Sequence, residues 1–439
     1  MKIYNTLTKR SEIFKPIEEN KVTMYICGPT VNKRTHLGHM YPAIFFDVVY
    51  RYFKYLGYDV KYASNFTDID DKIIESSLEE GISEKEVAEK YEKLYLDDLK
   101  KVNCLDIDYR PKVTEYINDI TEFISLLIEK GYAYKKGTDV YMNVKKLDNY
   151  GILSNQKIED LEYGNRIEVD QNKENPYDFV LWKDTEKGIK WDTPFGEGRP
   201  GWHTECVVMI NKIFGGLIDI HGGGVDLKFP HHENEIAQSE AICHNTLANY
   251  WMHNGHLMRD GVKMSKSLGN VLTVDDLLEK YSPNAIRIGI LKNHYRNPLN
   301  LSDRLFEESE TINEKILNAL KSANAYIQLN NLGDTSNINV DLTSFEKEMD
   351  DDFNISNVFT YILDLVKTLN NSIRASNEDI IYIYKKILII ADVLGLRYNL
   401  AKFNQEDIKI YKEWNELRNN KEFEKADKLR AQLVTKGIL

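Results

Sequence analysis

The sequence predicts an α/β protein: a Rossmann-like, doubly wound parallel sheet that carries an insertion and is followed by an all-α helical bundle. Three observations lead to this prediction. The first third of the chain alternates strand and helix patterns, residues 113–197 show short strand-like pieces among Gly, Asp, Asn and Lys, and the chain after residue 304 has mostly helical periodicity. With 439 residues, 42% of them hydrophobic, the chain can fill the cores of roughly two to four domains.

The parallel sheet is expected to begin near the N-terminus. Residues 22–26 (VTMYI) have the pattern of a short buried strand, and residues 59–65 resemble a second one. Between them, residues 39–56 carry apolar side chains at helical spacing and end before Gly57, a suitable C-terminal cap. A strand, a helix and a strand in this order form a right-handed crossover. Residues 217–220 (LIDI) again resemble a buried strand, so we expect the sheet to resume there.

The C-terminal part is expected to be helical. After a first helix that begins near residue 304, helical patterns cover residues 344–372, 377–396 and 405–436. The segment 331–339 (NLGDTSNIN) has the composition of a loop.

Composition excludes several classes of protein. No run of about 18 apolar residues occurs, and the first residues lack a signal peptide, so we expect a cytoplasmic protein with no membrane partner. The net charge of −12 argues against non-specific coating of nucleic acid, although a local basic patch can still bind RNA. Four cysteines are too few for a disulfide scaffold, and each could simply be a small buried side chain.

The first motif with chemical potential is THLGH, residues 35–39, in the first predicted strand-to-helix turn. Ligands of open α/β sheets bind at the carboxyl ends of the strands, where a helix N-terminus favours anions. His36 and His39 lie one turn apart and can donate to phosphate oxygens, while Gly38 lets a nucleotide approach the backbone. The alternative is a pair of surface histidines at a helix start.

The second motif is KMSKS, residues 263–267, in a loop before a helical stretch. Lys263 and Lys266 are suited to neutralising a polyphosphate during its transfer. A short run of this kind is more often a solvated basic loop, but the joint occurrence of the two motifs is specific.

With these motifs the sequence resembles the class I aminoacyl-tRNA synthetases, and most closely the cysteinyl-tRNA synthetase family. The resemblance covers roughly residues 1–300. It is carried, in family order, by MYICGPTV before THLGH, NFTDIDDK (65–72), GRPGWHTEC (198–206), HGGGVDLKFPHHENEIAQ (221–238) and YWMHNGHL (250–257).

The resemblance implies one zinc ion per chain, bound through two Cys, one His and one Glu. The matching positions are Cys27, Cys206, His231 and Glu235. The physical pattern agrees, because the last two are four residues apart on a predicted helix and share a face. We expect Cys27 to follow the first strand and Cys206 to lie in a turn-rich stretch. Without the family, a purely structural zinc would be the default interpretation.

Neighbouring residues receive other roles in this interpretation. His232 and Glu233 point elsewhere on the helix and are expected to support the ligands or to lie at the surface. Cys104 and Cys243 match no ligand position and are expected to be structural.

The resemblance also implies the reaction: L-cysteine and ATP, with Mg²⁺, give cysteinyl-adenylate, and the cysteine then moves to tRNA(Cys). Cysteine and serine have nearly the same shape, and a simple pocket rejects such a substitute by only about 10²-fold, so zinc would read the sulfur directly. His36 and His39 would stabilise the phosphates, and Lys263 and Lys266 the pyrophosphate. The residues implied near the amino acid or adenylate are Thr67, Trp202, His221 and Asp226. Each of these could instead be a turn former or a core residue.

The family suggests six parts along a chain that we expect to be monomeric. They are 1–112 and 198–250 (the two halves of the catalytic domain), 113–197 (connective insertion), 251–305 (stem-contact region with KMSKS), 306–400 (helical bundle) and 401–439 (C-terminal helical piece).

The last piece has a local charge opposite to that of the whole chain. Between Lys409 and Lys436, six Lys and two Arg face four Glu and one Asp, a net of +3. Tyr411, Trp414 and Phe423 could stack on RNA bases there, or form the core of a helix pair. The family usually continues past a similar KGI into a small anticodon-reading module, which we expect to be absent here.

Two other functions compete with the ligase. One is a relative that joins cysteine to an amino-sugar in thiol-cofactor synthesis, and the other is a non-catalytic RNA-binding paralogue. The second should have lost one of the two motifs, whereas both are intact.

Overall fold

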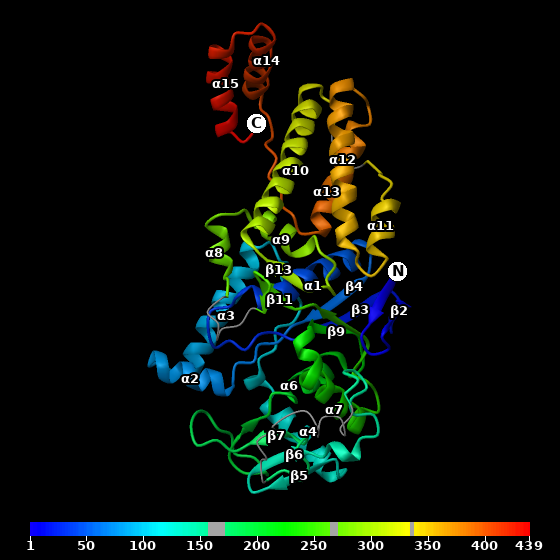
Figure 1. Ribbon diagram of the computed structural model, residues 1–439, viewed down its shortest axis with the longest axis vertical. Coiled ribbons are helices and arrows are strands. Elements are labelled where there is room, and N and C mark those ends of the chain that lie inside the picture. Colours follow the sequence, from blue (N-terminus) through cyan, green and yellow to red (C-terminus); the bar gives the residue numbers. More distant parts are fainter. Residues whose placement is uncertain (157–171, 264–270, 334–337) are drawn as a thin grey trace. The chain divides into compact units, whose positions relative to one another are not determined.

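The computed structural model describes residues 1–156, 172–263, 271–333 and 338–439 (Figure 1). The chain forms two compact units. The first comprises Met1–Asp276 with Tyr295–Leu301, and the second comprises Leu277–His294 with Ser302–Leu439.

The first unit is built on a four-stranded sheet in the order β10-β9-β3-β4, in which every neighbouring pair is parallel. This confirms the predicted parallel sheet and its resumption near residue 217. The strands are β3 (Lys21–Ile26), β4 (Asp59–Ala63), β9 (Ile218–Gly224) and β10 (Ala248–Asn254).

The connections of this sheet define a topological switch point. Helix α1 (Leu37–Tyr55) joins β3 to β4, and α7 (Glu233–Cys243) lies between β9 and β10. The chain thus runs outward in opposite directions from the two central strands, β3 and β9, and right-handed crossovers place α1 and α7 on opposite faces. Both faces of the sheet are covered, and the last three residues of β3, Met24 to Ile26, are accordingly all buried, although its first four residues alternate. Ligands bind at such a switch point, beyond the carboxyl ends of the strands.

One hydrophobic cluster fills the face of the sheet next to α7. Helices α4 (Ile117–Glu129) and α6 (Glu205–Phe214) pack with α7, and their buried residues join Tyr25, Ala63 and Trp251 of the strands.

The predicted strand-like pieces of the insertion form a second, antiparallel sheet in the order β5-β6-β7-β8. Its strands are β5 (Ala133–Lys136), β6 (Asp139–Met142), β7 (Phe179–Lys183) and β8 (Arg199–Pro200). The six-part division of the chain stays a prediction.

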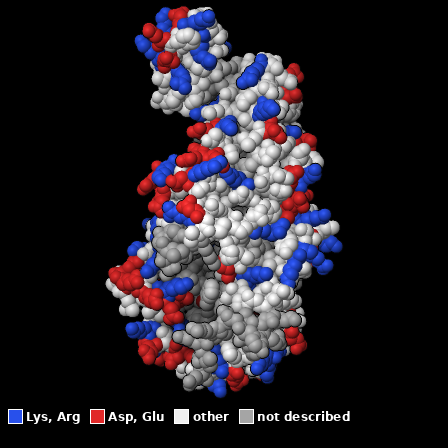
Figure 2. Space-filling model, viewed as in Figure 1, with Lys and Arg blue, Asp and Glu red and all other residues white. Residues whose placement is uncertain are grey.

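The remaining elements of the first unit lie outside these two sheets. They are β1 (Lys2–Asn5), β2 (Arg10–Ile13), α2 (Asp71–Glu80), α3 (Glu84–Lys101), β11 (Leu257–Arg259), β12 (Val262–Lys263) and β13 (Leu299–Leu301). Helix α2 carries four acidic residues, and Figure 2 shows acidic side chains gathered over it.

The second unit is helical, as predicted. Its helices are α9 (Pro283–Leu291), α10 (Asp303–Leu329), α11 (Thr343–Met349), α12 (Ile355–Ala375), α13 (Ile380–Val393), α14 (Gln405–Asn419) and α15 (Phe423–Thr435), and α8 (Val274–Leu278) precedes them at the boundary of the units. None of the helices in the described ranges is long and apolar enough to cross a membrane.

Two of the predicted helical stretches are each divided in two. The stretch 344–372 is broken because Asp352 and Phe353 have φ of 56° and 53°, after which Asn354 caps α12. The stretch 405–436 is broken before α15, where Lys421 has φ of 62°. A residue in the left-handed conformation ends a helix. Such a residue is usually glycine, but here it is not, so the sequence does not reveal where the helix is broken.

Candidate metal and nucleotide site

The structure brings together the four residues that the sequence nominated as metal ligands. Ligand atoms of Cys27, Cys206, His231 and Glu235 all lie within 4.8 Å of one another. The two sulfur atoms are 3.7 Å apart, and His231 Nε2 lies 3.6 Å and 3.8 Å from them. The same nitrogen lies 2.9 Å from Glu235 Oε1. Two thiols, an imidazole and a carboxylate at such short separations fit the ligand set of a zinc ion.

Three separate segments of the chain deliver these ligands to the switch point. Cys27 follows β3, and its backbone N–H donates to Gly222 of β9 at 3.2 Å. Cys206 is the second residue of α6, which corrects the expected turn: the four apolar residues after it are buried and continue the helix. His231 lies in the segment η4 (Lys228–His232), which is kinked at the non-helical Phe229 and runs directly into α7, where Glu235 occupies the first turn.

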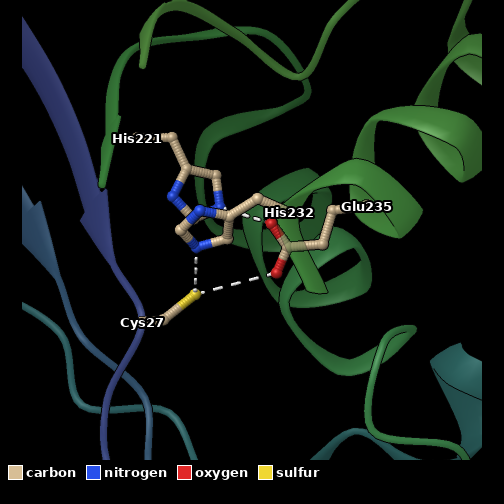
Figure 3. Close-up of side chains that lie close together, drawn as sticks. All are labelled: Cys27, His221, His232 and Glu235. Carbon is tan, nitrogen blue, oxygen red and sulfur yellow. Dashed lines mark hydrogen bonds and ion pairs between the residues drawn. The ribbon is translucent and has the colours of Figure 1, made fainter. Parts of the chain in front are cut away.

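A second set of four overlaps the first. Cys27 and Glu235 also lie within 4.8 Å of His221 and His232. Figure 3 shows this set: His232 Nε2 is 3.3 Å from the sulfur of Cys27, and His221 Nε2 is 2.8 Å from Glu235 Oε2. Of the two positions expected for His232 and Glu233, beside the ligands or at the surface, the structure excludes the surface, because both are at most 1% exposed. The Glu233 carboxylate instead accepts three backbone N–H bonds from Gly151, Leu153 and Ser154, which joins α7 to the insertion.

Further histidines surround the candidate ligands, and the sequence interpretation missed them. His203 Nδ1 lies 3.1 Å from His231 Nδ1. His232 Nδ1 lies 2.8 Å from His253 Nε2, whose ring in turn contacts the Thr6 hydroxyl at 3.0 Å. Both histidines lie inside the motifs GRPGWHTEC and YWMHNGHL, and their place in these motifs was the feature of the sequence that could have marked them as site residues.

The electrostatics of the cluster show strong coupling between its members. Burial alone would raise the pKa of Glu235, but His221 and His231 hold it well below its usual range. Burial opposes the charged form of His231, yet Glu235 and Cys206 raise its pKa to about 10. The hydrogen bond from Cys27 lowers the pKa of Cys206 to about 7, whereas burial raises the pKa of Cys27. A metal cation that binds to these groups would displace their protons.

The THLGH motif forms the turn into α1. His36 is the N-cap residue, and its Nδ1 accepts from the backbone N–H of Gly38 at 3.0 Å. The backbone N–H of His36 donates to His39 Nδ1 at 3.4 Å. The turn therefore places both imidazole rings, with centroids 4.1 Å apart, at the positive end of a 19-residue helix.

One cavity of about 440 Å³ is lined by this turn and by Cys27, one of the candidate metal ligands. Among its lining residues are Cys27, His36, Gly38, His39, Trp202 and Asp226. A groove that runs from a cation site to a helix N-terminus can hold a small zwitterion at one end and phosphates at the other.

The other predicted contact residues take different positions. Trp202 stacks on His231, with centroids 4.2 Å apart, and is 40% exposed. Asp226 lines the cavity. Thr67 is buried and donates to Glu205 Oε2 at 2.9 Å, and burial raises the pKa of that carboxyl well above its usual value. His221 is fully buried against Glu235.

The KMSKS motif lies largely outside the described residues. The backbone of Lys263 ends β12 and pairs with Met258 of β11. Lys266 belongs to the segment 264–270, which is not described.

Comparisons with known proteins agree with the geometry. The family described as "tRNA synthetases class I (C) catalytic domain" matches residues 13–311, and the "DALR domain" matches residues 344–399. A protein of Acholeplasma laidlawii named cysteine–tRNA ligase is 47% identical over 439 residues, which cover all of both chains. Another of the same name from Staphylococcus aureus is 44% identical, over all of this chain and 97% of the relative.

Solved structures show the same fold at low identity. Methionyl-tRNA synthetase of Mycobacterium tuberculosis, in complex with methionyl-adenylate, has a TM-score of 0.64 at 13% identity, over 85% of this chain and 89% of that one. Arginyl-tRNA synthetase of Thermus thermophilus has a TM-score of 0.56 at 12% identity, over 90% of this chain and 85% of that one. The fold is thus that of class I synthetases, and at this level of full-length identity the chain belongs to the cysteine–tRNA ligase family of class I aminoacyl-tRNA synthetases.

Proposed function

We propose that this chain joins L-cysteine to tRNA(Cys) in two steps, through cysteinyl-adenylate made from ATP. In the first step the cysteine carboxylate attacks the α-phosphate and pyrophosphate leaves. In the second the cysteinyl group moves to the terminal ribose of the tRNA. The observation that supports this best is the cavity lined both by the THLGH turn and by Cys27, which clusters with Cys206, His231 and Glu235.

The nucleotide end of the cavity is assigned to the THLGH turn. His36 and His39 would donate to the phosphate oxygens of ATP, whose magnesium ion comes with the substrate. Gly38 lacks a side chain where the nucleotide passes the backbone. No covalent enzyme intermediate is required, so the turn contributes positioning and electrostatic stabilisation. Lys263 and Lys266 would neutralise the pyrophosphate as it leaves.

The amino-acid end is assigned to the metal cluster. A zinc ion held by Cys27, Cys206, His231 and Glu235 would bind the thiolate of the substrate and so distinguish cysteine from serine. Thr67, Trp202, His221 and Asp226 are proposed to surround the amino acid and adenylate. Trp202 is well suited to contact the substrate, because its ring is partly exposed and is held in place by stacking on His231. His221 and Thr67 are buried, so they would act through Glu235 and Glu205.

The RNA is proposed to contact the helical second unit of the chain, in a cytoplasmic, monomeric enzyme with the six-part organisation predicted above. In the α14–α15 hairpin, Trp414 is 7% exposed and packs in the core with Ala426, Leu433 and Ile438. Phe423 is 61% exposed and is the aromatic residue of this hairpin best placed to stack on a base. Figure 2 shows Lys and Arg interspersed with Asp and Glu on the visible face of this hairpin, so its small positive excess is distributed.

The decisive experiment is cysteine-dependent ATP–pyrophosphate exchange. The proposal predicts exchange with cysteine and its loss after zinc is chelated and removed, with recovery on adding zinc. Parallel charging assays with tRNA(Cys) and with an amino-sugar acceptor test the second step. Exchange that persists without zinc, or transfer to the sugar and not to the tRNA, would refute the corresponding part of the proposal.

A further inference from the structure

A buried carboxylate lies directly beneath the THLGH turn. Asp98, in the last turn of α3, has a fully buried side chain. It accepts from Arg34 Nη2 at 2.9 Å and from the Thr35 hydroxyl at 3.2 Å, the two residues that precede His36. Lys101 adds a third donor to the same carboxylate at 3.3 Å. One carboxylate therefore gathers three donors, and two of them lead directly into the first histidine of the motif.

The same donors reach a second segment of the chain. Arg34 Nη2 and Lys101 Nζ each also lie 2.5 Å from the carboxylate of Asp275. Nearby, the backbone N–H of Leu37 donates to the carbonyl of Leu272 at 2.8 Å. Both Leu272 and Asp275 belong to the short segment that follows the KMSKS motif in sequence.

That segment has its own internal bonds. The backbone N–H and hydroxyl of Thr273 donate to Asp276 Oδ2 at 2.8 Å and 2.7 Å, and the N–H of Asp276 donates back to the Thr273 hydroxyl at 3.2 Å. This is a capping box, which defines where the next helix begins. The contacts to Asp275 and Leu272 therefore join the THLGH turn to an ordered anchor.

We propose that Asp98 is a positioning residue for the nucleotide half of the reaction: through Arg34 and Thr35 it sets the THLGH turn, and through Arg34 and Lys101 it holds that turn against Asp275. Asp98 is not among the residues that line the cavity. Its effect passes through the backbone of the turn, where a small displacement of His36 would misalign the phosphates. The inference rests on the proposed function, since it gives His36 and His39 their role.

The test compares ATP and cysteine kinetics in the exchange reaction for Asp98→Asn. We expect kcat/KM for ATP to fall by about ten- to a hundredfold, as for a misplacement near 1 Å, with little change in the KM for cysteine. The cysteine end depends on other segments, so the split between the two substrates separates positioning from general loss of structure. Glu80→Gln is the matched control, because it removes a 2.7 Å ion pair to Lys90 of the same helix α3, away from the turn.

A second pair keeps the inference testable should the D98N protein fail to fold. Thr35→Val removes the hydroxyl with little change of shape, whereas Thr35→Ser keeps it. Lower ATP kcat/KM for T35V than for T35S supports the proposal, and equal values for the two overturn it. A folded D98N protein with wild-type ATP kinetics, or with a KM for cysteine that rises as much as the KM for ATP, also overturns it. Wild-type protein without cysteine-dependent exchange would instead refute the proposed function itself.

Discussion

The Nε2 atom of His232 lies 3.3 Å from the sulfur of Cys27, closer than Nε2 of His231 at 3.6 Å. The two adjacent histidines thus both approach the first cysteine, from one helical segment. They differ in their other partners, because only the set with His231 includes a second sulfur, from Cys206. Zinc favours thiolate ligands, so we assign the ion to the set with two cysteines.

This assignment predicts different outcomes for the two histidines. His231→Gln should abolish stoichiometric zinc binding, whereas His232→Gln should retain the ion with affinity weaker by about 10- to 100-fold, as expected for a residue behind the ligands. Chelator competition and metal analysis of the two purified proteins measure this. The reverse order would give the ion to the set of Cys27, His221, His232 and Glu235.

Two cysteines, one inside the cluster and one outside it, provide a matched comparison for metal content. Cys206→Ser should lose zinc because it removes a thiol whose pKa is lowered to about 7. Cys243→Ser should keep it, since the Cys243 sulfur contacts Asn211 at 3.8 Å, away from the cluster. Zinc loss in both proteins would point to a general effect of serine on folding and not to ligation.

Substrate selection provides a third prediction. The wild-type protein should prefer cysteine over serine in pyrophosphate exchange by well over the roughly 10²-fold that pocket shape alone provides. Titration of the protein with each amino acid in a calorimeter gives an independent measure. Serine binding as tight as cysteine binding would show that the sulfur is not read by the metal.

A fourth prediction concerns the KMSKS lysine that lies outside the described residues. Lys266→Ala should lower the rate of adenylate formation by about 10²-fold or more while leaving the affinity for cysteine near that of the wild type, because the lost charge acts on the leaving pyrophosphate. Lys280→Ala, an exposed lysine outside the motif, is the control. A near-normal exchange rate for K266A would contradict the assigned role.

The aromatic residues of the last hairpin should separate into structural and binding residues. Trp414→Ala should destabilise the α14–α15 hairpin by about 3–5 kcal/mol, the usual cost of removing a buried aromatic side chain. Phe423→Ala should change stability by no more than about 0.5 kcal/mol, since that ring is exposed. Thermal unfolding followed by circular dichroism reports both stability effects, and kcat/KM for tRNA in the charging reaction reports the role of Phe423 in binding. An unchanged charging rate for F423A would remove this residue from the RNA surface.

Much of the fold followed from local patterns in the sequence. Periodicity located β3, α1, β4 and β9, because the apolar pattern of each element lies within one short stretch of sequence. The splits at Asp352 and Lys421 were missed because a left-handed residue other than glycine leaves no trace in hydrophobic spacing. Cys206 was expected in a turn because Gly and Pro precede it, while the helix starts only at Glu205.

The candidate site followed from motif resemblance more than from spacing. Spacing placed His231 and Glu235 on one face, and the structure brings Cys27 and Cys206 to them. Spacing could not foresee that His232 also turns inward, since its buried position depends on tertiary contacts with Cys27 and His253. The same holds for His203 and His253, whose positions next to the cluster arise from tertiary contacts.

The switch point between β3 and β9 also constrains how the molecule is made. Thr23 of β3 is bonded to Asp219, 196 residues further along the chain, and β10 must then add to the far edge. During synthesis, β3 and β4 therefore emerge as a two-stranded piece that is at best marginally stable alone, and the insertion, continuous in sequence, has the chance to fold before the sheet is complete. The parallel sheet around which the thiols and imidazoles gather is complete only after β10, which ends at Asn254, has left the ribosome. A nascent chain shortened before β10 should therefore be cleaved readily by protease in the β3–β4 region, and a chain extended past it should resist.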